Sequence, residues 1–321
     1  MSPARLLRPF LVASLAWAAL AGDALAQGAT ETLAARCASA GAPALRCTEL
    51  AVTARALQGS VGLLAGLGSE VSGSAGTLGR RLGATPRIAV GARAAFAHVG
   101  LPDLTDPGAE PSREATFVVP AVRAGVAVGL FDGFFVLPTV GGVLSLDLLA
   151  NTSVLFVPTA DGFDGKASGW SLGARLGLLR ESFTLPGVAV SLTHRDVQPI
   201  RFGEALGAGG GAVESDATVT SVRATVGKDL LSVGLLAGMG WDRYGGSVTL
   251  RPVGMPEVHE GSFTHSRRLY FGGASLNFLI LQLSAEGGWA QGAGAVSGYR
   301  GAPFDPARGT AYGSVAFRLT I

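Results

Sequence analysis

Between Pro86 and Ile321, apolar side chains alternate with polar or small ones along ten segments of the chain. The segments are 88–96, 118–128, 144–156, 170–178, 188–192, 222–226, 231–241, 270–278, 281–289 and 312–321. Successive side chains of a β-strand point to opposite faces, so strict alternation predicts strands whose two faces differ. The pattern therefore predicts an all-β domain over 86–321.

The two faces of these segments differ in an unusual way. The apolar face has no charged residue at its central positions, whereas the other face holds Gly, Ala and Ser with one or two charges. A barrel in lipid is apolar outside and small or polar inside, and aromatic side chains mark its two interfaces. Phe96, Trp170, Trp241 and Trp289 lie near segment ends, where such a girdle is expected. We therefore expect an antiparallel, up-and-down transmembrane β-barrel.

The connections between segments alternate in length. Long connections are predicted at 100–114, 159–168, 196–216, 245–262 and 291–308. Short ones are predicted at 181–187, 228–230 and 279–280, with 130–142 as a longer exception. Long outer loops and short inner turns are typical of outer-membrane barrels, which have an even number of strands. About ten strands fit best, and eight or twelve remain alternatives.

Residues 1–26 have the features of a secretory signal peptide. Arg5 and Arg8 precede a short apolar run, and the segment ends in Ala24-Leu25-Ala26. A basic start, an apolar centre and an A-x-A end predict cleavage after Ala26 and export from the cytoplasm.

Residues 27–85 form a separate unit with helical periodicity. Leu50, Ala54, Leu57, Val61 and Leu64 recur at spacings of three and four residues. We expect Thr48 to cap this helix and Gly66 to end it. Gly59, Gly62 and Gly66 leave a smooth helix face that permits close packing. Two placements remain open: a periplasmic cap beneath the barrel, or a plug inside its lumen.

Cys37 and Cys47 are the only cysteines of the chain. In an exported protein, a close pair of cysteines predicts a disulfide. No histidine lies nearby to complete a metal site, and we expect no metal and no cofactor.

Composition agrees with an embedded barrel. Charged residues make up only 15% of the chain, glycine occurs 48 times and the mean hydropathy is +0.40. So little charge is atypical of disordered chains and of soluble globular proteins. The net charge of +2 gives no indication of nucleic acid as a partner.

The last strand carries the pattern that closes many outer-membrane barrels. Val315, Phe317, Leu319 and Ile321 alternate with polar residues up to the end of the chain. Over 86–321 and the signal peptide, the chain resembles bacterial outer-membrane β-barrel proteins. This resemblance implies the cell outer membrane as location, and its lipid and the barrel-assembly machinery as partners. With its N-terminal segment, the chain is also similar to fatty-acid-transporter-like barrels that have an N-terminal hatch.

Charged residues of the polar face are predicted to line the lumen. They are Arg93, Arg123, Asp147, Arg175, Arg195, Arg223, Asp242, Arg267, Glu286 and Arg318. A positive lumen favours anions, which predicts passive or facilitated passage of small anionic or amphipathic solutes. In the alternative, these groups pair with one another and fill the interior, as in small barrels.

Two other functions are open at this stage. His98, His194, His259 and His265 are all predicted at outer rims or loops, so a rim hydrolase using His194 or His265 is one alternative. No complete catalytic set is recognisable, so no catalytic residue is assigned and an enzyme is not expected. The other alternative is a structural or adhesive barrel that acts through its long outer loops.

Overall fold

The computed structural model describes residues 28–81, 85–105, 111–134, 142–164, 166–182, 185–204, 210–255, 258–296, 299 and 302–321. The predicted signal peptide, residues 1–26, lies outside the described residues.

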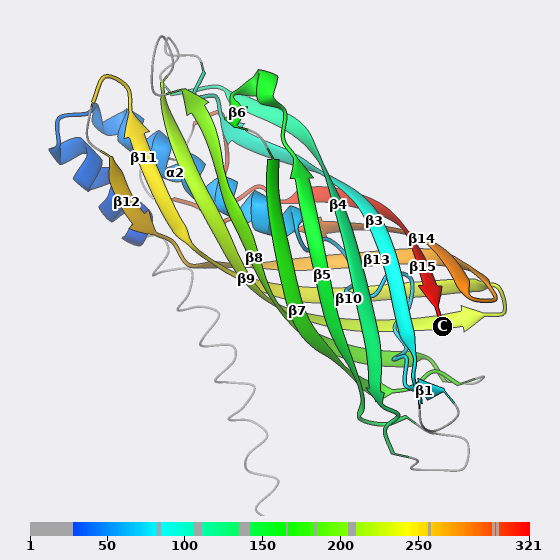
Figure 1. Ribbon diagram of the computed structural model, residues 1–321. Coiled ribbons are helices and arrows are strands. Elements are labelled where there is room, and N and C mark those ends of the chain that lie inside the picture. Colours follow the sequence, from blue (N-terminus) through cyan, green and yellow to red (C-terminus); the bar gives the residue numbers. More distant parts are fainter. Residues whose placement is uncertain are drawn as a thin grey trace, which may run out of the picture.

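Ten long antiparallel strands close into a barrel (Figure 1). They are β3 (Ile88–Pro102), β4 (Glu114–Phe131), β5 (Ser145–Phe156), β7 (Lys166–Leu179), β8 (Gly187–Glu204), β9 (Gly211–Leu230), β10 (Val233–Gly245), β13 (His265–Phe278), β14 (Leu281–Ala290) and β15 (Thr310–Thr320). Each pairs with the next along the chain, and β15 pairs with β3 to close the ring. The prediction of an antiparallel up-and-down barrel of about ten strands is confirmed.

The side chains alternate around the wall as the sequence pattern predicts. Large apolar residues such as Leu172, Leu192 and Phe317 are exposed on the outside, whereas Arg93, Ser191 and Arg223 are buried inside. An apolar exterior around a polar interior is the inverse of a soluble barrel and suits a lipid surround.

Several predicted loops contain further strands. The predicted loop 196–216 is mostly strand, because β8 continues to Glu204 and β9 begins at Gly211. The predicted loop 245–262 contains β11 (Ser247–Pro252) and β12 (His259–Ser262), and β11 pairs with the start of β9. Glycine and charged residues interrupt the alternation of apolar and polar side chains at these strand ends, so the pattern predicts loops there.

Short strands lie at both ends of the barrel. β6 (Phe163–Asp164) pairs with β8, and β1 (Arg80–Arg81) pairs with β2 (Thr85–Pro86) in a separate two-stranded sheet. The two ends of the barrel therefore differ. We call the end that carries β6, β11 and β12 the long-loop end, and the end that carries the β9–β10 and β13–β14 hairpins the short-turn end.

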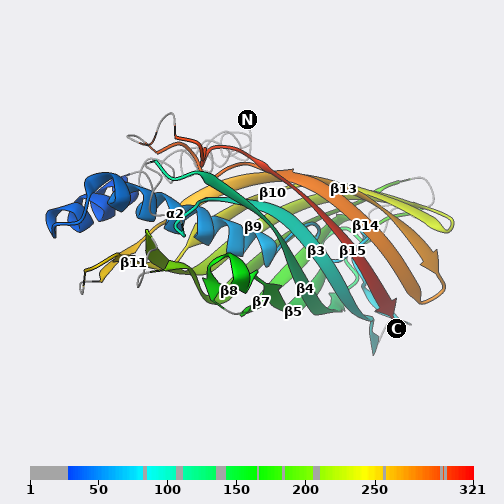
Figure 2. The same cartoon turned by 90° about the horizontal axis from the view of Figure 1, so that it is seen from above.

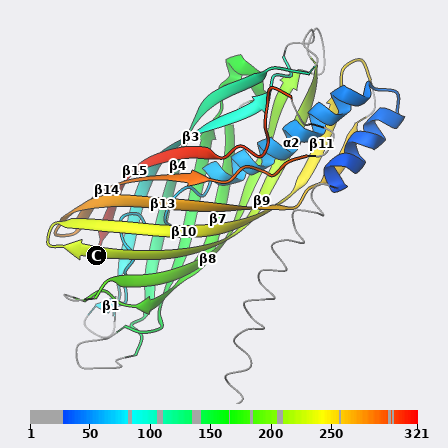
Figure 3. The same ribbon diagram turned by 180° about the vertical axis from the view of Figure 1, so that it is seen from behind.

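The N-terminal segment enters the barrel from its long-loop end (Figures 2 and 3). Residues 28–39 are helical and lie at that end beside β11 and β12. Helix α2 (Ala44–Leu64) follows and runs into the lumen, where it contacts β3, β4, β8, β9 and β10. Residues 65–79 continue to the short-turn end, where β1 and the C-terminus lie. We call 44–79 the luminal segment.

Helix α2 begins earlier than predicted. Its N-cap position is Pro43, so Thr48 lies within the helix, where its hydroxyl donates to the carbonyl of Ala44. The predicted cap was wrong because the first turn forms one turn earlier, where the carbonyl of Pro43 accepts the N–H of Cys47 at 3.0 Å. The helix ends at Leu64, close to the predicted Gly66.

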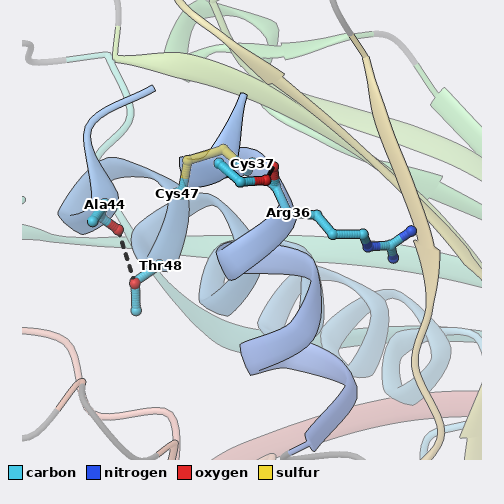
Figure 4. The surroundings of a disulfide bond; sticks show 6 residues. Arg36, Cys37, Ala44, Cys47 and Thr48 are labelled. Atoms are coloured by element: carbon cyan, nitrogen blue, oxygen red, sulfur yellow. Dashed lines mark hydrogen bonds between the residues drawn. A yellow bond between two sulfur atoms is a disulfide. The ribbon is translucent and has the colours of Figure 1, made fainter. Parts of the chain in front are cut away.

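A disulfide joins Cys37 to Cys47, with a Cα–Cα distance of 5.7 Å (Figure 4). It ties the helical segment 28–39 to the first turns of α2. Among the described residues, no helix is both long and apolar enough to span a membrane.

Candidate functional site in the barrel lumen

Gly59 and Gly62 of α2, and Gly66 just beyond its end, receive large side chains of the barrel wall. A β-carbon at Gly62 would stand 2.7 Å from the ring of Tyr244, and one at Gly66 would stand 2.5 Å from the guanidinium of Arg195. One at Gly59 would stand 2.8 Å from the imidazole of His265. The predicted smooth face of the helix therefore packs against wall side chains, and side-chain volume at these positions would push the helix away.

Glu70, just beyond α2, is the centre of the charge pairing between the luminal segment and the wall. Its carboxylate forms an ion pair with Arg195 of β8 and lies 3.5 Å from Arg123 of β4. Thr193 donates a further hydrogen bond of 3.2 Å to it. Arg123 also donates to the carbonyls of Ser69 and Glu70. A buried carboxylate with two guanidinium partners holds the segment to two strands at once.

Arg93 and Glu286 form a second buried pair, with a nitrogen–oxygen distance of 3.1 Å. Glu286 also accepts the backbone N–H groups of Ser69 and Gly73, at 2.9 and 3.2 Å. Arg93 donates to the hydroxyl of Ser72 and to the carbonyl of Leu67. The wall pair thus satisfies backbone groups of the luminal segment that have no partner of their own in a helix or strand.

A third pair lies near the short-turn end. Arg175 and Asp147 are 2.7 Å apart, and Asp147 accepts the N–H of Leu78 through both oxygens at 3.1 Å. Beside them, the hydroxyls of Thr77 and Ser145 are 2.5 Å apart. This end of the luminal segment is therefore also attached to the wall by polar contacts.

The remaining predicted luminal charges lie elsewhere along the lumen. Arg223 pairs with Asp242, which also accepts the hydroxyl of Tyr244 at 3.0 Å. Arg318 donates to the carbonyl of Ser72 at 3.1 Å. Arg267 lies over the ring of Tyr244, 5.5 Å from its centroid.

All ten predicted luminal charges thus lie on the inner, buried or half-buried side of the wall. Three of the arginines pair with the three wall carboxylates, which is the alternative to an open positive passage. Sequence reasoning missed Glu70, the partner of two others. Its signal was present, because Glu70 is the sole acidic residue between Glu49 and Asp103.

Little free space remains around Glu70. A cavity of about 40 Å³ adjoins Arg123, Asn151 and Arg318. Such a volume holds a water molecule or two at most. The luminal segment thus occupies the middle of the barrel.

The four histidines were predicted together at outer rims or loops, but they do not share one face of the barrel. His265 is the first residue of β13 at the long-loop end, as predicted for a rim residue, but its side chain is fully buried on the inner face and stacked on Tyr244, with 5.0 Å between ring centroids. His194 and His98 lie within β8 and β3 with their side chains on the outer face, and His259 begins β12. His194 contacts the hydroxyl of Thr220 at 3.3 Å. Among the described residues, no hydrogen bond joins His194 or His265 to a carboxylate.

No group of three or more metal-ligating side chains occurs in the part of the chain that the structure describes.

No protein-family model matches the sequence, and no curated protein matches it significantly. Solved structures do match. The translocator domain of the autotransporter NalP from Neisseria meningitidis has 10% identity and a TM-score of 0.43, over 73% of this chain and 88% of that one. The outer membrane protease OmpT from Escherichia coli has 10% identity and a TM-score of 0.36, over 74% and 96%. The Pseudomonas putida toluene transporter TodX has 8% identity and a TM-score of 0.33, over 73% and 88%.

Proposed function

We propose that this protein is an outer-membrane barrel that lets small solutes through only when its luminal segment moves. The observation that carries the proposal is that 44–79 closes the lumen from within. The wall itself presents small residues such as Ala89, Gly91, Gly125 and Ala127 to this space. A barrel of this size that closed itself would be filled by its own side chains.

The contacts of 65–79 favour a segment that can be released. They include hydrogen bonds and ion pairs, which water can replace, beside a small apolar cluster of Val71 and Leu78 with the wall. Residues 69–79 also contain four glycines or alanines besides their serines and threonine. Release would take Glu70 away from Arg195 and Arg123. The predicted luminal charges of the wall, seven arginines against three carboxylates, would then favour anions.

A cross-link between the luminal segment and the wall tests the proposal. Thr77→Cys with Ser145→Cys joins the two where their hydroxyls are 2.5 Å apart. Single-channel recording in planar bilayers should show no openings of the oxidised variant and openings after reduction. The reversal potential in a KCl gradient should indicate a preference for chloride.

Two controls make this experiment specific. Asn151→Cys with Ser171→Cys joins two facing wall residues of β5 and β7, neither of which forms a hydrogen bond with the luminal segment among the described residues, so its oxidised form should still open. Wild-type protein with the same reductant reports the effect of breaking the Cys37–Cys47 disulfide. Absence of openings in wild type, in the reduced variant and in the wall-to-wall control would contradict the proposal.

A second candidate function is partner binding at the long-loop end. β8 and β9 run over 18 and 20 residues, whereas a strand needs about 9–11 residues to cross a bilayer. In this proposal, the long-loop end of the barrel therefore extends beyond the membrane, together with β11, β12 and the disulfide-linked helices. Replacing 248–261 by a short Gly-Ser turn should abolish binding to a host or cell surface and leave the barrel folded. Unchanged binding would exclude this surface.

A further inference from the structure

A side cavity of about 210 Å³ lies near the long-loop end, apart from the contacts that hold 65–79. It is bounded by α2, by the long-loop ends of β3 and β4, by residues 292–293 and 304–309, and by the start of β15. Its lining includes Ala56, Ser60, Thr116, Arg267, Phe304 and Thr310. We call it the side pocket.

Arg267 is the one lining residue that enters from the interior of the barrel wall, on β13. Its side chain is 5% exposed. Among the described residues it has no ion pair and no hydrogen bond, and its buried Nε lacks an acceptor. Its contact with the ring of Tyr244 is electrostatic but supplies no hydrogen-bond acceptor. A buried guanidinium without an anion is costly, which indicates that its partner comes from outside the chain.

The charges around the side pocket favour an anion. Arg55 of α2 lies beside it and donates to the carbonyl of Ala293, a lining residue. Arg308 and Glu114 at the rim are 2.9 Å apart and neutralise each other. Asp305 accepts the N–H of Ala307 at its own turn. Arg267 is therefore the buried charge of the side pocket, whereas Asp305 is exposed and engaged at its own turn.

The other lining residues indicate the chemistry of the uncharged part of a ligand. Phe304 and Ala56 are buried apolar residues, and Ser60, Thr116 and Thr310 also line the pocket. The hydroxyls of Ser60 and Thr310 donate to the carbonyls of Ala56 and His98. Small-molecule sites typically combine an apolar surface with a few placed polar groups. The volume is smaller than that of a typical drug-sized site, about 300–1,000 Å³.

We propose that the side pocket binds a small carboxylate, with its charged group on Arg267 and its apolar body against Phe304 and Ala56. A planar guanidinium accepts a carboxylate through two parallel hydrogen bonds. The proposal does not depend on movement of the luminal segment.

Isothermal titration calorimetry of the full chain in detergent micelles, with benzoate as the probe, tests this binding. We expect saturable binding of benzoate, and at least tenfold weaker binding of the uncharged benzamide. Arg267→Gln should weaken benzoate binding at least tenfold. Arg318→Gln, at a luminal arginine that binds Ser72, should leave it unchanged.

A second variant separates binding from folding. Ala56→Leu keeps Arg267 and fills the pocket from the helix side, so it too should lose benzoate binding. Circular dichroism and thermal unfolding check that each variant keeps the barrel. Equal binding by wild type and both pocket variants would overturn the proposal. So would the absence of any heat up to about 10 mM benzoate. Binding of inorganic phosphate without benzoate would overturn the assignment to a carboxylate.

Discussion

Glu70 of the luminal segment and Arg195 of β8 form a buried ion pair, although 125 residues separate them along the chain. The same carboxylate faces Arg123 of β4. One side chain thus connects the segment to strands from two regions of the barrel wall. The following predictions begin from this contact.

Replacing Glu70 by Gln should loosen the luminal segment. The substitution keeps the shape but leaves Arg195 and Arg123 without a buried counter-charge, which costs about 3–5 kcal/mol. We expect more frequent channel openings in planar bilayers and a lower free energy of unfolding. Glu204→Gln, at an exposed carboxylate, is the control and should behave as wild type. Identical opening frequencies for both variants would count against Glu70 as an attachment point.

Adding volume to the side of α2 that packs against the barrel wall should displace the helix. Gly62→Val places side-chain carbon where Tyr244 and Val219 are already 2.7 Å from a β-carbon position. Overpacking of this kind costs about 1–3 kcal/mol. We expect a lower thermal unfolding temperature and faster trypsin cleavage at Arg55. At Gly76 the nearest atom would be 3.7 Å away, so Gly76→Ala should change neither quantity.

The two lysines report the orientation of the barrel. Lys166 begins β7 at the long-loop end, and Lys228 lies near the end of β9 at the short-turn end. With long loops outside the cell, a membrane-impermeant amine reagent should label Lys166 on intact cells and Lys228 only after lysis. Ser39→Lys on the helical segment should add a second labelled site on intact cells. The reverse labelling would contradict this orientation.

A charge on the outer face should destabilise the protein in proportion to its depth. Leu192 of β8 is 55% exposed on that face. Leu192→Arg should cost about 2–4 kcal/mol if the side chain faces lipid near mid-bilayer. Leu231→Arg, at a fully exposed turn tip, should cost little. Urea unfolding from lipid vesicles measures both, and equal values would argue against a lipid-facing Leu192.

A turn residue offers a stabilising change. Leu279 has φ 51° in the two-residue hairpin between β13 and β14. A left-handed conformation costs a leucine roughly 1–2 kcal/mol, and Asn tolerates it better. Leu279→Asn should raise the free energy of unfolding by up to about 1 kcal/mol. Ile280→Asn is a matched control that leaves the strained position unchanged and should give no such gain.

The wall of the barrel was predictable in detail. Arg93, Arg175 and Arg223 were placed on the inner face and Phe317 on the outer face from alternation alone, since the strand repeat of two residues directly assigns faces. The ends of β8 and β9 at the long-loop end were not predicted, because glycine and charged residues interrupt the alternation of apolar and polar side chains there. His265 lies at the strand end where it was predicted, and only the structure shows that its side chain is buried in the lumen against Tyr244.

By itself, the sequence determined that the chain forms a barrel, which side chains face outward and which ends carry the long connections. These properties are local, because each follows from the repeat of one strand or the length of one connection. Only the tertiary structure decided that 44–79 lies inside the barrel and that Glu70 contacts Arg195. The helix α2 is buried on all its sides, so no amphipathic pattern marks its partner. The contacts of the luminal segment join residues far apart in the chain, and closure of the ring is what brings them together.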